Sequence, residues 1–242
     1  MVDESYLQAL TSYASLSKDD VVLEIGAGLG TLTKMLSTLC SRIIAIEIDD
    51  RLMKVLKEEL GNLSNVALIK GNVLEITIPA FNKVVSNPPF HISSPILYWL
   101  FNQTFDSAVL TFQKEFVERL VAKVGSKDYS RLTVETYYFA DVEPLRAVPK
   151  EAFYPPPDVD ALIVRLKPRK IAPFHLENED VFHELVRTLF TQRNRKVRNA
   201  VEGFLHKLGK ERKLVDSLLF QNKRVRQLAP EDFGAIANAL AS

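Results

Sequence analysis

The stretch Val21-Val-Leu-Glu-Ile-Gly-Ala-Gly-Leu-Gly30 decides the fold expected of this chain. It reads as a buried strand, then a turn with glycine at alternate positions, and it leads into an amphipathic segment, predicted to be a helix, over Thr31–Leu39. Such a turn lets the backbone approach a ligand closely, with the N–H groups of the helix facing it. We therefore expect an α/β domain with a ligand site at this turn. The alternative is that the glycines only permit tight packing of helix on strand.

The segments around this turn alternate between strand and helix patterns. Helical spacing of apolar residues predicts helices over 6–16, 51–60 and 115–124, and another from about Ser93. Alternation of this kind predicts a mostly parallel sheet with helices on both faces. The predicted strands are Val21–Ile25, Arg42–Ile48, Val66–Lys70, Lys83–Ser86, Ser107–Phe112 and a late antiparallel pair, Thr133–Phe139 with Leu162–Leu166.

The last third of the chain differs in pattern and in charge. Pro168–Pro173 is typical of a linker, and only helical patterns follow Asp180. We therefore expect a first domain over residues 1–170 and a small all-α domain over 171–242. Between Arg187 and Arg226 the sequence has twelve lysines and arginines against three acidic residues, although the whole chain carries a net charge of only +1. This asymmetry favours a polyanionic partner for the second domain.

Bulk composition is that of a globular protein of one large and one small domain. The chain has 242 residues, of which 47% are hydrophobic and 25% charged. The single cysteine, Cys40, excludes an internal disulfide framework and fits a reducing compartment. We find no signal peptide and no apolar run of membrane length. We therefore expect a cytoplasmic protein with no membrane association.

A second candidate site is the tetrapeptide Asn87-Pro88-Pro89-Phe90, which directly follows the predicted strand Lys83–Ser86. Loops at the carboxyl ends of strands bind the ligands of open α/β sheets. Two consecutive prolines make the loop stiff and leave its carbonyls free to accept hydrogen bonds. The Asn87 side-chain oxygen and a neighbouring carbonyl are placed to grip one amino group, and Phe90 offers a face for a planar ring. The alternative is a rigid turn with Phe90 in the core.

Acidic and amide side chains at the ends of neighbouring strands favour S-adenosylmethionine as the ligand of the glycine turn. The spacing Gly-x-Gly-x-Gly at Gly26, Gly28 and Gly30 is not the dinucleotide pattern Gly-x-Gly-x-x-Gly. Glu24 offers a carboxylate for the amino-acid ammonium, and Glu47 stands where an acidic side chain typically accepts both ribose hydroxyls. Ile48 is placed to pack on the adenine. Asn72 either accepts from the adenine amine or is a turn residue after Gly71, and both readings stay open.

Taken together, these motifs resemble the KsgA-type small-subunit ribosomal RNA adenine dimethyltransferases, in their archaeal or eukaryotic form. The resemblance rests on five motifs in the correct order along nearly the whole chain. Two departures are that the chain begins where a Gln-x-Phe-Leu segment of the family would end, and that Asn72 stands where Asp is more common. The motifs are Glu24–Gly30, Glu47, Asn87–Phe90, Phe153-Tyr-Pro-Pro-Pro-Asp-Val159, and the helical-domain pair Phe190–Asn199 and Arg226–Phe233.

The resemblance implies a Rossmann-like class I methyltransferase fold with a seven-stranded sheet and a helical C-terminal domain. It implies transfer of methyl groups from S-adenosylmethionine, leaving S-adenosylhomocysteine, to the 6-amino groups of two adjacent adenosines near the 3′ end of small-subunit rRNA. Asn87 and Pro88 would orient the amine, and Phe90 and Phe153 would stack on the base. No metal is expected, since in-line displacement requires only alignment, and the four histidines show no ligand spacing.

The basic stretch Gln192–Arg198 is the predicted rRNA-binding surface, on an amphipathic helix. Its proposed contacts are Arg193, Arg195, Lys196 and Arg198, and a solvated helix face is the alternative. The expected partner is small-subunit rRNA or a precursor of the small ribosomal subunit, bound by a monomer. Three other functions stay open: a ribosome-assembly or transcription factor without turnover, an adenine methyltransferase of large-subunit rRNA or DNA, and, disfavoured by the glycine spacing, a dinucleotide-dependent oxidoreductase.

Overall fold

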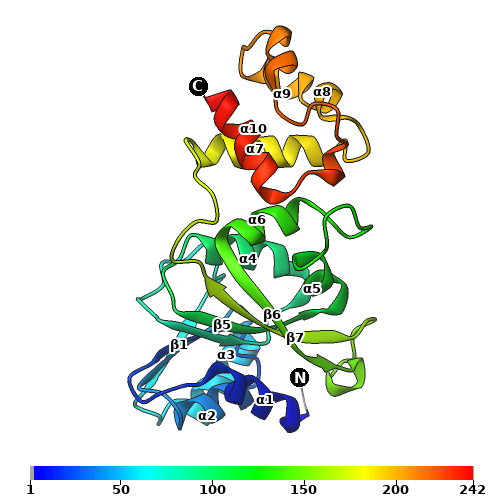
Figure 1. The fold of residues 1–242 in the computed structure, drawn as a ribbon. Coiled ribbons are helices and arrows are strands. Elements are labelled where there is room, and N and C mark those ends of the chain that lie inside the picture. Colours follow the sequence, from blue (N-terminus) through cyan, green and yellow to red (C-terminus); the bar gives the residue numbers. More distant parts are fainter. Residues whose placement is uncertain (1–2, 242) are drawn as a thin grey trace. The chain divides into compact units, whose positions relative to one another are not determined.

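The computed structural model describes residues 3–241, and these form two compact units (Figure 1). The first, here called the sheet unit, comprises the chain up to Val117 together with Val142–Pro168. The second, the helical unit, comprises Glu118–Asp141 and the chain from Arg169 onward. The later boundary lies beside the expected residue 170. The structure differs from the expected division in that Glu118–Asp141 packs with the C-terminal helices.

The sheet unit is built on a seven-stranded sheet of order β3-β2-β1-β4-β5-β7-β6. Strands β1 to β5 are parallel to their neighbours, and β7 runs antiparallel to β5. The predicted fold class, a Rossmann-like methyltransferase fold with a mostly parallel sheet, is confirmed. The strands are β1 (Val21–Ile25), β2 (Arg42–Glu47), β3 (Val66–Lys70), β4 (Lys83–Ser86), β5 (Ser107–Gln113), β6 (Ala140–Val148) and β7 (Ala161–Pro168).

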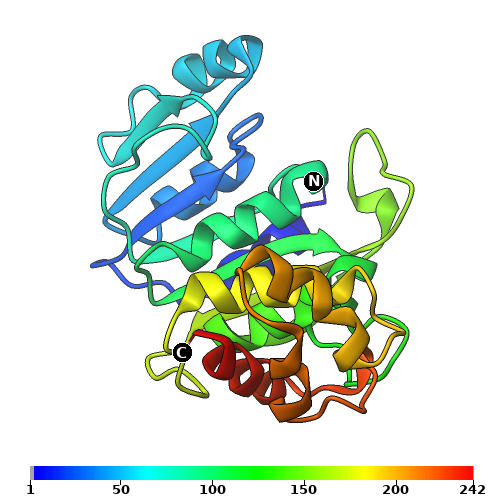
Figure 2. The same cartoon turned by 90° about the horizontal axis from the view of Figure 1, so that it is seen from above.

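Helices cover both faces of this sheet, with α1 and α2 on one face and α4 on the other (Figures 1 and 2). Strands β1 and β2 are buried almost throughout, as expected of central parallel strands. Aspartates begin two of the helices, because Asp3 accepts from Ser5 N–H (2.9 Å) and Asp49 accepts from Arg51 N–H (2.7 Å). The helices are α1 (Glu4–Ala14), α2 (Thr31–Ser37), α3 (Asp50–Leu60), α4 (Ser93–Phe101) and α5 (Lys114–Leu120).

The helical unit has its own hydrophobic core, formed by α6, α7 and α10 with the short helices between them. Phe182, Phe204 and Phe233 are among its fully buried side chains. Tyr129 joins this core and donates its hydroxyl proton to the Leu228 carbonyl (2.8 Å). The elements are α6 (Arg131–Phe139), α7 (Glu179–Phe190), α8 (Val197–Ala200), α9 (Glu202–Lys207), α10 (Pro230–Ala241) and the 3₁₀ turns Arg212–Ser217 and Val225–Gln227.

One predicted strand is wrong. Thr133–Phe139 lies in helix α6, and the sheet is completed instead by β6, which begins at Ala140. The Thr, Val and Tyr content of this segment favours strand. As a helix, however, it places Val134 and Tyr138, one turn apart, in the helical core, and residues 132–136 are all buried. Thr133 also supports the helix start, since its hydroxyl accepts from Ser130 N–H (3.1 Å). The partner predicted for this strand, Leu162–Leu166, lies within β7 and pairs with β5.

The basic stretch Gln192–Arg198 is likewise not within one helix. Helix α7 ends at Phe190, and α8 begins only at Val197. The segment between them pairs with a later one, because Val197 N–H donates to Lys223 O (2.9 Å) and Val225 N–H donates to Arg195 O (3.0 Å). These bonds between distant segments replace the helical ones. The four predicted RNA contacts therefore lie on a turn and the first residues of α8.

Candidate active site

The candidate active site lies where the strand order reverses, between β1 and β4. The carboxyl ends of these neighbouring strands carry the two predicted loops, the glycine turn and the Asn87–Phe90 loop. Backbone pairing of β1 with β4 covers Val22 and Leu23, and a side chain continues it. The Ser86 hydroxyl donates to the Ile25 carbonyl (2.6 Å) and accepts from the Ile25 N–H (3.1 Å). Ser86 thus ties the ends of the two strands together directly below both loops.

Two adjoining cavities open at this strand edge. The glycine-turn cavity, of about 500 Å³, is lined by Glu24, the glycine turn and the start of α2. The proline-loop cavity, of about 360 Å³, is lined by Glu47, the Asn87–Phe90 loop and Phe153–Pro155. Residues shared by the two cavities are Gly26, Gly28, Leu52, Asn87 and Tyr154. The structure therefore brings most of the predicted cofactor residues and all of the predicted catalytic residues to one place, whereas Ile48 and Asn72 are not among the lining residues.

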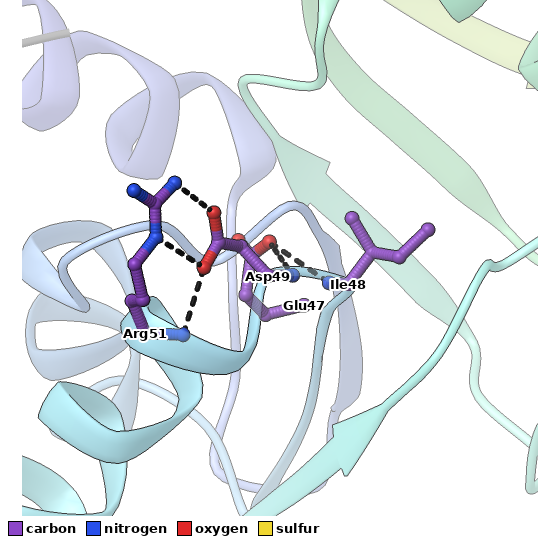
Figure 3. A network of polar contacts seen from close by, with 4 residues as sticks. All are labelled: Glu47, Ile48, Asp49 and Arg51. Atoms are coloured by element: carbon purple, nitrogen blue, oxygen red, sulfur yellow. Dashed lines mark hydrogen bonds and ion pairs between the residues drawn. The ribbon is translucent and has the colours of Figure 1, made fainter.

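Glu47 holds the glycine turn in position through Gly28 and also binds the two backbone N–H groups that follow it, which Figure 3 shows. Its Oε2 accepts from Gly28 N–H (2.9 Å), and its Oε1 accepts from Ile48 N–H (2.8 Å) and Asp49 N–H (3.0 Å). A carboxylate has about four acceptor positions, so about one remains for a ligand. Accepting both ribose hydroxyls would require Glu47 to release one of these backbone donors. Gly28 has φ = +60° and open space beside its Cα, which suits a turn that a ligand approaches closely.

Ile48 and Asp49 follow Glu47 and point away from it (Figure 3). Ile48 is 63% exposed but is not among the residues that line the two cavities, so its contact with an adenine stays a prediction. Asp49 is turned the other way, to Arg51, whose hydrogen bonds lower the pKa of the Asp49 carboxyl to about 2. Glu47 lines the proline-loop cavity, whereas Asp49 is not among the residues that line either cavity.

Glu24 is a buried carboxyl with an unsatisfied oxygen. It is 2% exposed, lines the glycine-turn cavity, and its Oε2 has no hydrogen-bond partner within the described chain. Burial, together with the smaller effect of the nearby Glu47 charge, raises the pKa of Glu24 to about 8. A cation that entered the cavity would favour the ionised form. This environment fits the ammonium group of an amino-acid ligand.

Asn87 presents the second unsatisfied acceptor of the site. Its Oδ1 is buried without a hydrogen-bond partner among residues 3–241, and the residue lines both cavities. An unpaired buried amide oxygen costs about 1–3 kcal/mol, so a donor that reaches it from a ligand gains that free energy. Pro88 is buried behind it, and the carbonyl of Pro89 is used by Ile92 N–H (3.2 Å). Asn87 is therefore set to receive an N–H group in either cavity.

Phe90 and Phe153 contact each other at the proline-loop cavity, and their stacking on the two faces of a base stays a prediction. Their ring centroids lie 5.6 Å apart and the ring planes meet at 69°, an edge-to-face contact. A base stacked between two rings needs parallel planes roughly 7 Å apart, which is twice a van der Waals contact distance. The two rings therefore have to separate and turn before both stack on one base.

Asn72 has the turn role that the sequence left open. Its Oδ1 accepts from Leu74 N–H (3.1 Å), and its Nδ2 donates to Glu75 Oε1 (2.8 Å). It is not among the residues that line the two cavities in the described chain. Contact of Asn72 with an adenine stays a prediction, because its oxygen keeps one free acceptor position.

The predicted RNA contacts divide into one structural and three exposed residues. The Arg193 guanidinium donates to the carbonyls of Lys127 (2.8 Å) and Ser126 (2.9 Å), so it holds the helical unit together. Arg195, Lys196 and Arg198 are exposed. Arg198 also lines a cavity of about 540 Å³ whose wall is of mixed charge, because Arg212 there pairs with Glu202 (2.8 Å).

Sequence reasoning missed several residues of the site. Ser86 was not singled out, although it directly precedes Asn87 and bonds to Ile25. Leu52 was not singled out either, although it lines both cavities. Leu29 is 65% exposed within the glycine turn, an unusual exposure for leucine that marks the wall of a cavity. Placement of such residues depends on which loops meet, and a single sequence carries little signal for that.

Comparison with known proteins decides the family. The family model described as ribosomal RNA adenine dimethylase matches residues 1–242. The chain belongs to this family. The predicted resemblance is thereby confirmed, and with it the class of enzyme, an rRNA adenine dimethyltransferase.

Relatives and solved structures agree with this assignment. A probable ribosomal RNA small subunit methyltransferase A of Methanosarcina acetivorans is 42% identical over 99% of this chain and 90% of the relative. One of the same description from Methanopyrus kandleri is 41% identical over 100% of this chain and 90% of the relative. A solved dimethyladenosine transferase from Plasmodium falciparum superposes with a TM-score of 0.84, at 29% identity over 97% of this chain and 94% of that one. The 23S rRNA methyltransferase ErmE superposes with a TM-score of 0.72, at 26% identity over 99% of this chain and 98% of that one.

Residues 3–241 contain neither a membrane-spanning helix nor a metal-binding cluster. No helix in this range combines the length and apolar character needed to cross a membrane. The same residues include no group of three or more His, Cys, Asp and Glu side chains placed to hold a metal ion.

Proposed function

We propose that this chain transfers methyl groups from S-adenosylmethionine to the 6-amino groups of two adjacent adenosines near the 3′ end of small-subunit rRNA. The family supports dimethylation of rRNA adenine, and the relatives described as small-subunit enzymes support the choice of subunit. The observation that carries the proposal is the unpaired, buried Oδ1 of Asn87, which lies at the junction of the two cavities. An acceptor there suits an amino group brought next to the methyl donor.

The glycine-turn cavity is the proposed binding site of the methionine end of the cofactor. The unsatisfied Glu24 oxygen is available for its ammonium group, and Gly26 and Gly28 leave room for close backbone approach. Glu47 is the proposed ribose ligand, and Ile48 covers the adenine. When bound, S-adenosylmethionine supplies a methyl group on a positively charged sulfur. The raised pKa of Glu24 fits this ligand, because an ammonium group nearby compensates the cost of ionising a buried carboxyl.

Asn87 and Pro88 are the proposed positioning groups for the reacting amine. The exocyclic nitrogen of adenine is a poor nucleophile because its lone pair is delocalised into the ring. If the Asn87 amide oxygen and the Pro88 carbonyl accept its two hydrogens, the nitrogen becomes pyramidal and its lone pair turns toward the methyl group. The remainder of catalysis is alignment at short distance. Each transfer would leave S-adenosylhomocysteine and release one amine proton to solvent. After the first transfer one N–H would remain for Asn87 or Pro88 to accept, and a second cofactor molecule would supply the second methyl group.

Phe90 and Phe153 are the proposed stacking partners of the target base. Enzymes that act on a base take it out of its stack, and stacking on aromatic side chains returns roughly 1–3 kcal/mol per base. The edge-to-face contact of the two rings fills this space while no base is present. Entry of a base exchanges a ring–ring contact for two base–ring contacts.

The exposed basic residues of the helical unit are the proposed rRNA contacts. Arg195, Lys196 and Arg198 are solvent-exposed, and Arg212 and Lys213 lie beside Arg198. Contacts of lysine and arginine with phosphates supply affinity that weakens with salt. We also propose that the protein acts as a monomer on the small-subunit precursor in the cytoplasm, where its single cysteine stays reduced.

Two other functions are separated by one experiment. The likeness to a 23S rRNA methyltransferase favours large-subunit RNA as the alternative substrate, and a factor without turnover is the non-enzymatic one. Labelled S-adenosylmethionine is offered with unmethylated small subunits and, in parallel, with large subunits. The proposal predicts label in the small subunit alone, mapping to two adjacent dimethyladenosines near the rRNA 3′ end. Label in the large subunit, or none in either, contradicts it.

A further inference from the structure

The segment 149–160 between β6 and β7 stands out from the sheet as an ordered loop (Figure 2, light green). Its base is closed by Lys150 N–H, which donates to Asp160 Oδ1 (3.0 Å), and by Lys114 N–H, which donates to Asp160 O (2.9 Å). Three consecutive prolines, Pro155–Pro157, stiffen the tip by fixing φ. The loop therefore presents its side chains in a fixed arrangement.

Two consecutive aromatic residues of this loop face in different directions. Phe153 is only 8% exposed and contacts Phe90, whereas Tyr154 is 82% exposed. Tyr154 still belongs to the site, because it lines both the glycine-turn cavity and the proline-loop cavity. A large aromatic ring that is exposed on a rigid loop beside a site is available for a ligand to stack on.

A third cavity, here called the flanking cavity, adjoins the proline-loop cavity. Its volume is about 590 Å³, and both cavities are lined by Phe153, Tyr154 and Pro157. The other lining residues are Pro156 and three charged residues, Lys150, Glu151 and Asp158. Its size lies within the range of small-ligand sites. A chain of nucleotides that places one base in the proline-loop cavity thus finds a second site next to it.

We propose that the flanking cavity holds the nucleotide next to the target adenosine, with its base stacked on Tyr154, an inference that rests on the proposed function. Flipping the target base out of its stack leaves the neighbouring base without a stacking partner on one side. The exposed ring of Tyr154 replaces that partner. Stacking on an aromatic ring is available to every base.

The charged residues of the flanking cavity favour a base over a phosphate beside Tyr154. They favour in particular a base that carries an amino group. The carboxylates of Glu151 and Asp158 repel a phosphate, but they accept hydrogen bonds from the amino group of an adenine. Lys150 is the one lysine or arginine among the described residues that line this cavity, and it is the proposed contact of the adjoining phosphate. The second adenosine of the proposed substrate meets these requirements, whereas uracil has no amino group to offer.

The test combines a protein variant with an altered RNA. Small subunits are reconstituted with a synthetic rRNA 3′ hairpin in which the nucleotide on either side of one target adenosine is intact or abasic. Methyl transfer to that adenosine is measured with the wild-type protein, with Tyr154→Ala, and with Tyr154→Phe, which keeps the ring. A second readout needs no turnover: 2-aminopurine at the neighbouring position loses fluorescence when it stacks.

The proposal predicts that kcat/KM falls for Tyr154→Ala by between about 5-fold and 150-fold, the range that corresponds to one base–aromatic stack. The abasic neighbour should lower kcat/KM of the wild-type protein by a similar factor and should have no further effect on Tyr154→Ala. Tyr154→Phe should behave as wild type. The inference would be overturned if the abasic neighbour lowered kcat/KM of Tyr154→Ala as much as it lowers that of the wild type. It would also be overturned if neither change had an effect.

The fluorescence readout separates this inference from the proposed function. Quenching of 2-aminopurine by wild-type protein, and not by Tyr154→Ala, supports the flanking site even if no methyl group is transferred, and in that case the proposed function alone has failed. Methyl transfer without any quenching has the opposite meaning: the proposed function stands and the flanking site is rejected.

Discussion

At the scale of single residues, the site is defined by acceptors that the protein itself leaves unused. Glu24 and Asn87 each bury an oxygen without a hydrogen-bond partner in the described chain. Such groups destabilise a fold unless a ligand satisfies them. Their positions beside the glycine turn and in the Asn87–Phe90 loop link the sequence motifs directly to binding chemistry.

Glu24 should make the ligand-free protein less stable as the pH rises. Its folded-state pKa, about 8, is above the ordinary value of 4.5, so the folded protein holds this proton more tightly than the unfolded chain does. Its contribution to stability is therefore full below pH 4.5 and is lost as the pH rises toward 8. For the wild type, the free energy of unfolding in urea should be lower at pH 8.5 than at pH 6, by a few kcal/mol at most. Glu24→Gln should not show this decrease. Equal pH dependence in both proteins would show that Glu24 is ionised at pH 6.

Glu47→Gln should weaken binding of S-adenosylmethionine. A hydrogen bond to a charged group contributes about 1.5–3 kcal/mol, so the dissociation constant measured by calorimetry should rise about 10-fold to 100-fold. Asp50→Asn is the matched control, because Asp50 is an exposed neighbour whose partner is Lys70. An unchanged dissociation constant for Glu47→Gln would remove this residue from the ribose.

At the scale of elements, Ser86 replaces the backbone ladder where β1 and β4 separate. Its hydroxyl both donates to and accepts from Ile25 in a fully buried position. Ser86→Ala should leave the Ile25 N–H and C=O groups without these bonds and lower the free energy of unfolding by about 1–3 kcal/mol. Thermal unfolding measures this, with exposed Ser64→Ala as the control. A loss no larger than that of the control would mean that water takes the place of the hydroxyl.

Helices and strands of the sheet unit were predictable where the local sequence pattern favours the same structure that packing in the fold requires. The strands β1 to β5 follow from continuous apolar runs, and the helices between them from 3.6-residue spacing. Prediction failed where packing decided against local preference: the β-prone Thr133–Phe139 became α6 because Val134 and Tyr138 are buried in the helical core. It failed also at Gln192–Lys196, where pairing with a segment about thirty residues away ends the helix.

Predictability of the site divides in the same way. Motifs that lie on one loop, such as Asn87–Phe90 and Gly26–Gly30, were placed correctly at the ends of neighbouring strands. The engagement of Glu47 by three backbone donors, and of Arg193 by two carbonyls, was not predictable, because each depends on residues brought near by the fold. Charge alone does not distinguish an arginine that binds RNA from one that closes a turn.

At the scale of the whole molecule, the proposed function divides between the sheet unit, which has the cavities, and the helical unit, which has the exposed basic residues. Replacing Arg195, Lys196 and Arg198 together by alanine should reduce the salt dependence of binding to small subunits, by about 0.7–0.9 in the log–log slope for each phosphate that the variant no longer neutralises. Lys54→Ala with Lys57→Ala, on the exposed side of α3, is the control. An unchanged slope would move the RNA-binding surface elsewhere.

The most direct test of the central claim is the single-turnover rate of methyl transfer to unmethylated small subunits by Asn87→Ala, measured together with cofactor affinity. Asn62→Ala, at an exposed asparagine, is the control. If Asn87 holds the reacting amine, the rate should fall by at least about 100-fold, the scale for loss of one hydrogen bond that stabilises a transition state, while the dissociation constant of S-adenosylmethionine changes less than about threefold. A variant that binds the cofactor weakly and still transfers methyl groups at the wild-type rate would contradict the account.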